Sequence, residues 1–375
     1  MHIPPFDMER WQSTWEHLVD INLSESGVEP QTPRELLGDD PDACAALLDQ
    51  QLVYTQTNGT VPLRERIMAL YPGATTDHVE VTNGGAEANC VSVTCLLEGG
   101  DEVVAMLPNY MQIPGWVRAL GAEVRGWNLV PDPEAGRWRP DLDALADLVT
   151  PRTRLICICT PNNPTGSIVT ADELDAICTV ADRAGAWVLS DEIYRGAERA
   201  TGEEAPSVWG RSDRVVVTSG LSKAYGLPGL RVGWIVGPPD FIDRCWTCHD
   251  YTTIAPGALS DRLATVALAP ERRAAILERT RRIVRDNYPV IAEWLAEHAR
   301  DLEHIPPAAG AMLWLSYRQS VNSTVLCERL RVEHGTLVVP GDHYGMDGYL
   351  RIGFGGEPEK LREGLTRVQT ALSSV

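Results

Sequence analysis

The middle of the chain alternates between short apolar runs rich in β-branched residues and longer amphipathic stretches with a helical period. The apolar runs predict strands at Val79–Thr82, Glu102–Leu107, Leu155–Thr160, Trp187–Ser190, Arg214–Ser219 and Arg231–Val236. The amphipathic stretches predict helices at Glu87–Leu97, Met111–Leu120, Leu142–Leu148 and Ala171–Ala184, the last behind a capping-box pair, Thr170 and Glu173. This alternation predicts an α/β domain with a largely parallel sheet that helices cover on both faces.

The character of the sequence changes after about Pro256. Ala258–Glu297 is predicted to be mostly helical, and it is followed by predicted short strands at Ala311–Tyr317, Thr336–Val339 and Tyr349–Phe354 and a closing helix from Pro358. The first forty-odd residues are Pro-rich and irregular, and we expect them to wrap this second module. Because 375 residues exceed one ordinary core, we predict a large α/β domain over residues 45–256 and a smaller α+β domain from residues 1–44 and 257–375.

Thirty-three basic residues against 52 acidic ones give the chain a net charge of −19. Such a surface repels phosphate backbones and anionic membranes, which argues against nucleic acid or a membrane as partner. No apolar run is long enough to span a bilayer, and Met1–Gln12 lacks the basic and apolar regions of a secretory signal. We therefore expect a cytoplasmic protein whose nine cysteines are reduced, buried thiols.

Lysine is scarce in this chain, which contains only Lys223 and Lys360. Arginine supplies the rest of the positive charge, and its guanidinium stays protonated, so it forms no Schiff base at neutral pH. Lys223 closes a Gly/Ser-rich turn directly after a predicted strand. A lysine retained at such a place is a candidate for amine chemistry.

Polar residues also follow the other predicted strands, at the carboxyl edge where open α/β sheets bind ligands. The turn Asn83–Asn89 opens a helix with glycines, so its free N–H groups suit a phosphate. Tyr110 and Asn163 place an aromatic ring and an amide after the next two strands. At the carboxyl edge of the sheet the sequence thus predicts an anion site, with the aromatic ring of Tyr110 and the amide of Asn163 close to it.

Two further strand ends and a C-terminal arginine complete the pattern. Asp191 is suited to a protonated ring nitrogen, and Tyr194 follows it at a distance that allows contact with a phenolic oxygen. Arg351 stands between apolar residues on a predicted strand, as suits bidentate capture of a carboxylate. These residues together suit a ligand that has a phosphate, a basic aromatic ring, a phenolic oxygen and an aldehyde that reacts with Lys223. That ligand is pyridoxal 5′-phosphate (PLP).

The same residues carry a family resemblance that covers nearly the whole chain. Asn-Pro-Thr-Gly at Asn163–Gly166, Asp-Glu-x-Tyr at Asp191–Tyr194, and Ser-Lys-x-x-Gly-Leu-x-Gly-x-Arg-x-Gly-Trp at Ser222–Trp234 are specific motifs. In these the chain resembles the class I/II aminotransferases of fold type I. That resemblance implies a large domain with a mostly parallel seven-stranded sheet plus a smaller α+β domain.

The resemblance also implies roles for individual residues. Lys223 would form the Schiff base and then act as general base and acid, while Gly27 and Arg351 would bind the substrate. The cofactor would be held by Gly85, Ala86, Glu87, Tyr110, Asn163, Asp191, Tyr194, Ser222, Arg231 and, in a homodimer with shared active sites, Tyr54. Relatives often carry a hydroxyl residue where this chain has Gly220, which leaves the role of the adjacent Ser219 open.

Two reactions are consistent with these residues, because fold and cofactor do not settle reaction type. The first is transamination of an L-amino acid to its 2-oxo acid. The second is elimination or cyclisation at the β or γ carbon of an amino acid such as a hydroxyarginine. The N-terminal stretch Asn22–Pro30 is similar to a capreomycidine synthase-like subgroup, in which Glu25 or Glu29 could meet a cationic side chain, although a solvated acidic loop is the simpler interpretation.

Other patterns are interpreted as structural. Cys245–His249 matches the haem c attachment pattern, but we interpret it as two packed cysteines on a helix and expect no haem. Cys157 and Cys159 alternate on a predicted buried strand, so we expect them to point to one face and assign them to the core. The histidines lack metal-ligand spacing, so no metal site is predicted. The chain shows no DNA-binding module of the kind that converts this fold into a transcriptional sensor.

Overall fold

The computed structural model describes residues 2–298 and 300–374; residues 1, 299 and 375 of the predicted small-domain ranges lie outside the described residues. Its largest sheet has the strand order β2-β9-β8-β7-β6-β3-β4-β5. The strands are β2 (Val79–Thr82), β3 (Glu102–Leu107), β4 (Glu123–Asp132), β5 (Arg137–Pro140), β6 (Thr153–Cys159), β7 (Trp187–Asp191), β8 (Val215–Gly220) and β9 (Gly233–Val236). All pairings from β8 to β4 are parallel, whereas β9 runs antiparallel to both of its neighbours. The predicted mostly parallel sheet is confirmed.

The edge strands β4 and β5 are the part of this sheet that the sequence pattern did not predict. β4 and β5 form an antiparallel hairpin at the sheet edge. Most of β4 is at least partly exposed, so it carries charged and polar residues in place of the apolar run of a buried strand. The sheet therefore has the seven strands expected from the resemblance, extended by β5.

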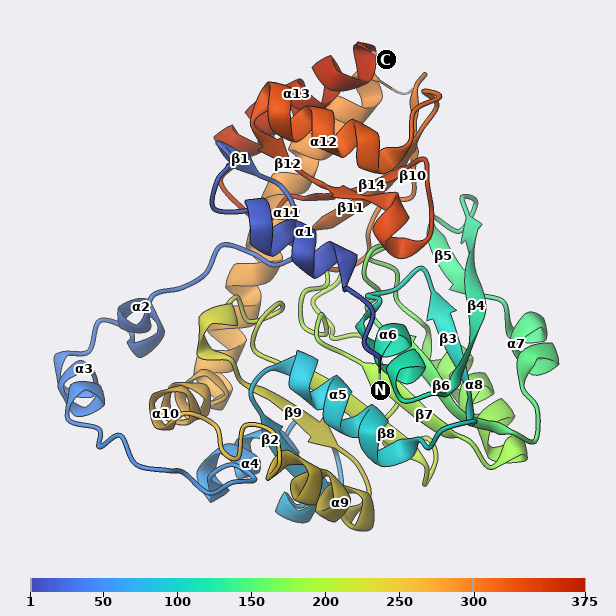
Figure 1. Ribbon diagram of the computed structural model, residues 1–375. Helices are drawn as coiled ribbons and strands as arrows, with labels where there is room; N and C mark the ends of the chain where they lie inside the picture. The colour runs from blue at the N-terminus through green and yellow to red at the C-terminus, as the bar shows by residue number, and fades with distance from the viewer. Residues whose placement is uncertain (1, 299, 375) are drawn as a thin grey trace.

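Helices cover both faces of the large sheet (Figure 1). They are α5 (Gly85–Leu96), α6 (Gln112–Ala119), α7 (Leu142–Leu148), α8 (Ala171–Ala184) and α9 (Pro239–His249). The capping box of α8 is present: Glu173 N–H donates to Thr170 Oγ1 and Thr170 N–H to the Glu173 carboxylate. Gly185 ends the helix in the left-handed conformation, which glycine adopts without strain.

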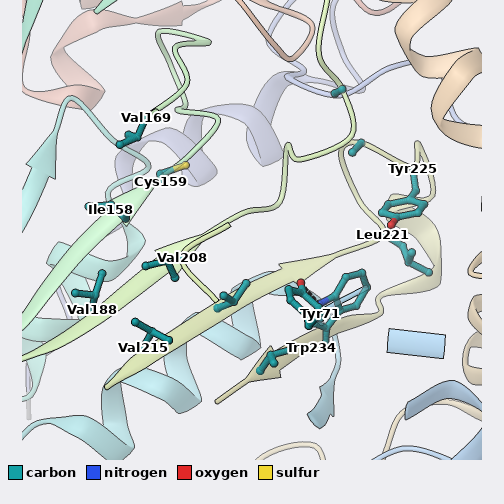
Figure 2. Close-up of a cluster of buried hydrophobic side chains, with 14 of the residues drawn as sticks. Tyr71, Ile158, Cys159, Val169, Val188, Val208, Val215, Leu221, Tyr225 and Trp234 are labelled. Atoms are coloured by element: carbon teal, nitrogen blue, oxygen red, sulfur yellow. Dashed lines mark hydrogen bonds between the residues drawn. The ribbon is translucent and has the colours of Figure 1, made fainter. Parts of the chain in front are cut away.

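The core of this sheet divides into an apolar cluster on each face. Figure 2 shows part of the larger cluster, in which Trp234 Nε1 donates a hydrogen bond of 3.0 Å to Tyr71 OH. Cys157 and Cys159 are both buried, as predicted. They pack in different clusters, however, and not on one common face as predicted; Cys159, the last residue of β6, also lines the cavity described below.

The second module follows α10 (Ala258–Ala267) and the long α11 (Pro270–Glu297), two helices where one helical stretch was predicted. Pro270 lies at the first position of α11, where its missing N–H costs nothing. An antiparallel sheet of order β10-β11-β14-β13 follows, formed by Leu302–His304, Met312–Tyr317, Tyr349–Gly353 and Val339–Pro340, with α12 (Ser323–His334) and α13 (Pro358–Ser373) packed on it. This arrangement confirms the predicted α+β character.

The N-terminal residues contact both modules. α1 (Asp7–Trp15), which the sequence analysis did not predict, lies between the two sheets (Figure 1), and Trp11 Nε1 donates to Val338 O. β1 (Ile21–Asn22) pairs in parallel with β12 (Thr336–Leu337). Then follow α2 (Pro33–Leu37), α3 (Pro41–Leu48) and α4 (Val61–Met68). Leu36 of α2 joins the larger cluster of the large sheet, so the domain boundary at residue 45 stays a prediction.

Candidate active site

A cavity of about 330 Å³ opens at the carboxyl edge of the large sheet, beneath α1 and residues 25–26. It is lined by residues from both modules: Met8, Glu9, Gln12, Glu25, Ser26, Gly85, Ala86, Asn89, Tyr110, Cys159, Asn163, Asp191, Ile193, Tyr194, Ser222, Lys223, Pro228, Arg231 and Arg351. Lys223 lies here, together with nine of the twelve other site residues predicted from the sequence and the resemblance. The position expected for ligands in open α/β sheets is thus the position of this cavity.

Lys223 stands between β8 and β9 and reaches the cavity from the loop that joins them. Its Nζ lies 3.5 Å from Glu25 Oε2. The nearby Lys223 ammonium holds the pKa of Glu25 below its usual value, against the effect of burial, and Arg351 adds to this lowering. Gly27 lies against the same lysine, since a Cβ there would be 3.6 Å from Lys223 Cδ and from Ser222 O. The predicted substrate-side glycine is therefore adjacent to the Lys223 side chain.

Asp191 lies at the end of β7, and its carboxylate is held by two hydrogen bonds. Asn89 Nδ2 donates to Oδ2 at 2.9 Å, and Ile193 N–H donates to Oδ1 at 3.1 Å. Burial raises the pKa of Asp191, and these two bonds oppose the rise. A cation in the cavity would therefore stabilise the charged form of this carboxylate.

Asn89 is a site residue to which the sequence analysis gave no role. Thr218 Oγ1 of β8 donates to Asn89 Oδ1 at 2.6 Å, which fixes the amide so that its NH₂ faces Asp191. The signal was present, because Asn89 follows Gly85 by four residues and so shares its helix face. Its contact with Asp191 depends on the packing of α5 over β7 and β8, which spacing alone does not give.

The predicted ring contacts, Tyr110, Tyr194 and Asn163, converge on the same cavity. Tyr110 OH donates to Glu9 Oε1 of α1 at 2.7 Å, and Tyr194 OH donates to Ser26 Oγ at 2.8 Å. Burial raises the pKa of both phenols, so each is a neutral donor. The two hydroxyls tie the N-terminal segment to the large sheet.

The predicted phosphate residues form a tight cradle at the start of α5. Gly84 has φ +96°, and a side chain there would collide with the Arg231 guanidinium. The helical hydrogen bonds of α5 begin with Glu87 N–H and Ala88 N–H, which both donate to Gly84 O. The N–H groups of Gly85 and Ala86 come before these and have no acceptor within the helix. Arg231 Nη1 lies 3.4 Å from Ser222 Oγ. This set of donors, with one guanidinium, matches a phosphate dianion.

Two predicted cofactor residues lie outside the cavity. The Glu87 carboxylate turns away toward the end of α9, where Thr252, Thr253 and His249 contact it. The Glu87 N–H donates to Gly84 O, so neither the side chain nor the N–H of Glu87 faces the cavity. Tyr54 is 86% exposed on the surface, so it does not serve the cavity of its own chain.

Arg351 lies on β14, and its side chain is only 1% exposed. Its Nη1 donates to Asn163 Oδ1 at 3.1 Å and to Tyr344 OH at 2.6 Å, while Nη2 donates to Ser24 O. Nε is buried without a partner. The guanidinium is therefore fixed beside Asn163 at the wall of the cavity.

The structure also shows the surroundings of Gly220 and Ser219 and of the Cys245–His249 segment. A Cβ at Gly220 would lie 2.8 Å from Val232 O, so a hydroxyl side chain does not fit there without a shift. Ser219 Oγ donates to Glu192 O, and Ser219 does not line the cavity. Cys245 and His249 lie on α9, as the helical interpretation required. Within residues 2–298 and 300–374 no cluster of metal-ligating side chains occurs, and every helix is too short or too polar to cross a membrane.

Comparison with known proteins fits this architecture. The chain belongs to the family of class I and II aminotransferases, whose model matches residues 21–368. It is 32% identical to capreomycidine synthase of Streptomyces vinaceus over 377 residues, which covers 99% of this chain and 95% of that protein.

Two solved structures are also similar over the whole chain. A PLP-dependent aminotransferase from Streptococcus suis superposes with a TM-score of 0.91 at 32% identity, covering 100% of this chain and 99% of the other. The PLP-dependent cyclase OrfR superposes with a TM-score of 0.88 at 28% identity, covering 100% and 98%. The protein is thus a fold type I enzyme of a PLP-dependent family, and the cavity residues fit that cofactor.

Proposed function

We propose that this protein is a PLP-dependent aminotransferase that converts an L-amino acid to its 2-oxo acid, with Lys223 as covalent anchor and proton carrier. The observation that carries the proposal is the presence of Lys223, Asp191 and Arg351 in one cavity. They supply an amine, a carboxylate for a ring nitrogen and a guanidinium for an α-carboxylate. PLP, when bound, supplies an electron sink that stabilises negative charge at the substrate Cα.

Each of these side chains then has a definite task. Lys223 Nζ is the basic atom placed to take the proton from the substrate Cα. Asn89 keeps the Asp191 carboxylate aimed into the cavity. Tyr194 and Asn163 offer neutral hydrogen-bonding groups, and α1 with residues 24–26 covers the cavity, which limits the access of water.

Replacing Arg351 by alanine is expected to raise KM for the amino donor about 10- to 100-fold, because a hydrogen-bonded charge pair is lost. The discrimination between the amino acid and its decarboxylated amine should collapse in the same variant. Steady-state kinetics check this, with Arg318→Ala, an exposed arginine after β11, as control. Unchanged KM and kcat for Arg351→Ala would remove Arg351 from the substrate site.

The acidic rim of the cavity supports a substrate with a cationic side chain. Glu9 and Glu25 line the cavity from the N-terminal segment. A second hollow of about 490 Å³ shares Glu25 with the cavity and adds Glu16, Asp20, Glu29 and Glu357, against Lys360 and His17. With the Lys223 amine engaged by PLP, Glu25 would be available to pair with a guanidinium or ammonium group of the substrate.

Glu25→Gln tests this substrate class with a matched pair of donors. We expect kcat/KM for L-arginine to fall about 10- to 100-fold, while kcat/KM for L-citrulline, which is uncharged but of the same shape, stays unchanged. Glu303→Gln, an exposed carboxylate on β10 that lines neither hollow, is the control. An equal fall for both donors would mean that Glu25 has only a structural role.

A PLP-dependent cyclase or lyase acting by β- or γ-elimination is the second candidate. The names of two similar proteins, capreomycidine synthase and the cyclase OrfR, favour it. Loss of a hydroxyl group needs an acid that protonates it. Glu25, whose Oε2 lies 3.5 Å from Lys223 Nζ, is the carboxyl group placed to take that role.

The exposed surface around Tyr54 supports a homodimer with shared active sites. Leu48, Leu52, Val53 and Tyr54 are all more than half exposed, which is typical of a surface that another subunit covers. Light scattering should therefore give twice the chain mass, and Tyr54→Ala should release the cofactor more readily; a monomer with full cofactor occupancy would contradict this. All nine cysteines are free thiols, but only five of them are buried as predicted, and the other four are partly exposed. Nine free thiols support a reducing, cytoplasmic setting.

A further inference from the structure

His249, the last residue of α9, has no exposed side-chain surface and lies between two carboxylates. Its Nδ1 is 2.9 Å from Glu80 Oε1 of the edge strand β2, and its Nε2 is 3.3 Å from Glu87 Oε2 of α5. Burial by itself disfavours the charged imidazolium, but the two carboxylates outweigh it and raise the pKa of His249 to about 9. The ring is therefore a buried cation at neutral pH.

Glu87 connects this cation to the start of α5. Its carboxylate accepts the N–H of Asn83 at 2.6 Å, and the hydroxyls of Thr252 and Thr253 at 2.7 and 2.9 Å. These bonds and His249 hold the pKa of Glu87 near 2 although burial raises it. The turn that forms the phosphate cradle is thus bonded on its outer side to a permanently ionised carboxylate.

That arrangement creates an electrostatic conflict. Glu87 lies in the first turn of α5, and the cofactor phosphate is proposed to lie at the same helix end, so two anions share one positive helix terminus. Asp250 adds negative charge nearby, whereas burial raises the pKa of Glu80 to about 7, so Glu80 is only partly ionised at neutral pH; Arg64 of α4 is close enough to lower that pKa. The imidazolium of His249 is the cation in direct contact with Glu87.

We propose that His249 is a positioning residue that offsets the charge of Glu87, so that the first turn of α5 keeps its shape and accepts a phosphate dianion. The inference rests on the proposed location of the cofactor phosphate at this turn and is independent of the reaction type. It gives a role to a histidine that touches neither cofactor nor substrate.

The test measures binding of PLP and of pyridoxal, which lacks the phosphate, to the apoenzyme by absorbance titration. His249→Gln should weaken PLP binding about tenfold or more, because it leaves the Glu87 charge uncompensated, and should leave pyridoxal binding unchanged. The double variant His249→Gln/Glu87→Gln should restore PLP affinity to near the wild-type value, since both charges are removed together. Circular dichroism and thermal melting verify that each apoprotein is folded.

Three results would overturn the proposal: wild-type PLP affinity in His249→Gln, equal losses for PLP and pyridoxal, or a double variant that binds PLP no better than the single one. The last two would indicate general damage to the fold in place of charge compensation. If the unaltered enzyme bound PLP and pyridoxal equally well, the phosphate location itself would be wrong, which is a different failure.

Discussion

Replacing Lys223 by alanine is expected to lower kcat/KM about 10²- to 10⁴-fold through the loss of proton transfer alone and to abolish the covalent link to the cofactor. The chain's other lysine, Lys360, does not line the cavity and lies on α13 with its side chain 63% exposed. Added methylamine should restore part of the activity, because a small amine can enter the space that the lysine side chain leaves.

Borohydride reduction followed by peptide mapping provides the measurement. The unaltered enzyme should carry the reduced cofactor on Lys223, and Lys360→Ala, the control at the other lysine, should behave in the same way. A cofactor adduct in the Lys223 segment of the Lys223→Ala protein would show that the assignment is wrong.

Replacing Asp191 by asparagine should reduce kcat about 10²- to 10³-fold, the range observed when a preorganised charge partner of a transition state is removed. Asparagine keeps the shape and one acceptor for Asn89 Nδ2, but it presents no negative charge to a ring nitrogen. Because the phosphate cradle is untouched, cofactor affinity should fall much less than kcat.

Single-turnover kinetics separate the two effects, with Asp182→Asn on the exposed face of α8 as control. An Asp191→Asn enzyme with kcat within about threefold of the unaltered enzyme would mean that Asp191 supports the fold but not the chemistry. A variant with slow chemistry and intact cofactor binding would agree with the electrostatic role.

The sequence predicted those site residues that stand at strand ends, because the parallel sheet brings all such ends to one edge. Asp191, Lys223 and Tyr110 were found in this way, and Lys223 was marked further by the scarcity of lysine. The sequence could not predict Asn89 or Ser26 as partners of Asp191 and Tyr194, since those contacts arise from packing between distant segments. The same holds for His249, whose partners come from β2 and α5.

The fold was predictable where its pattern was regular. The buried strands β2 and β3 and the helices α7 and α8 have the predicted bounds. The exposed hairpin β4–β5 lacks an apolar run, and α1 owes its place to contacts such as Trp11 with Val338 O. Local sequence therefore indicates elements with a buried, periodic face and misses those stabilised chiefly by distant contacts.

The reaction type is tested most directly by counting products in the absence of an amino acceptor. Cofactor-loaded enzyme is mixed with L-arginine, its hydroxylated forms and other amino acids, and the product per active site is measured. The proposed aminotransferase should release one equivalent of 2-oxo acid and then stop, with the cofactor left as pyridoxamine phosphate. Many turnovers without an acceptor, accompanied by loss of water or of a side-chain group, would contradict the account and identify a cyclase or lyase.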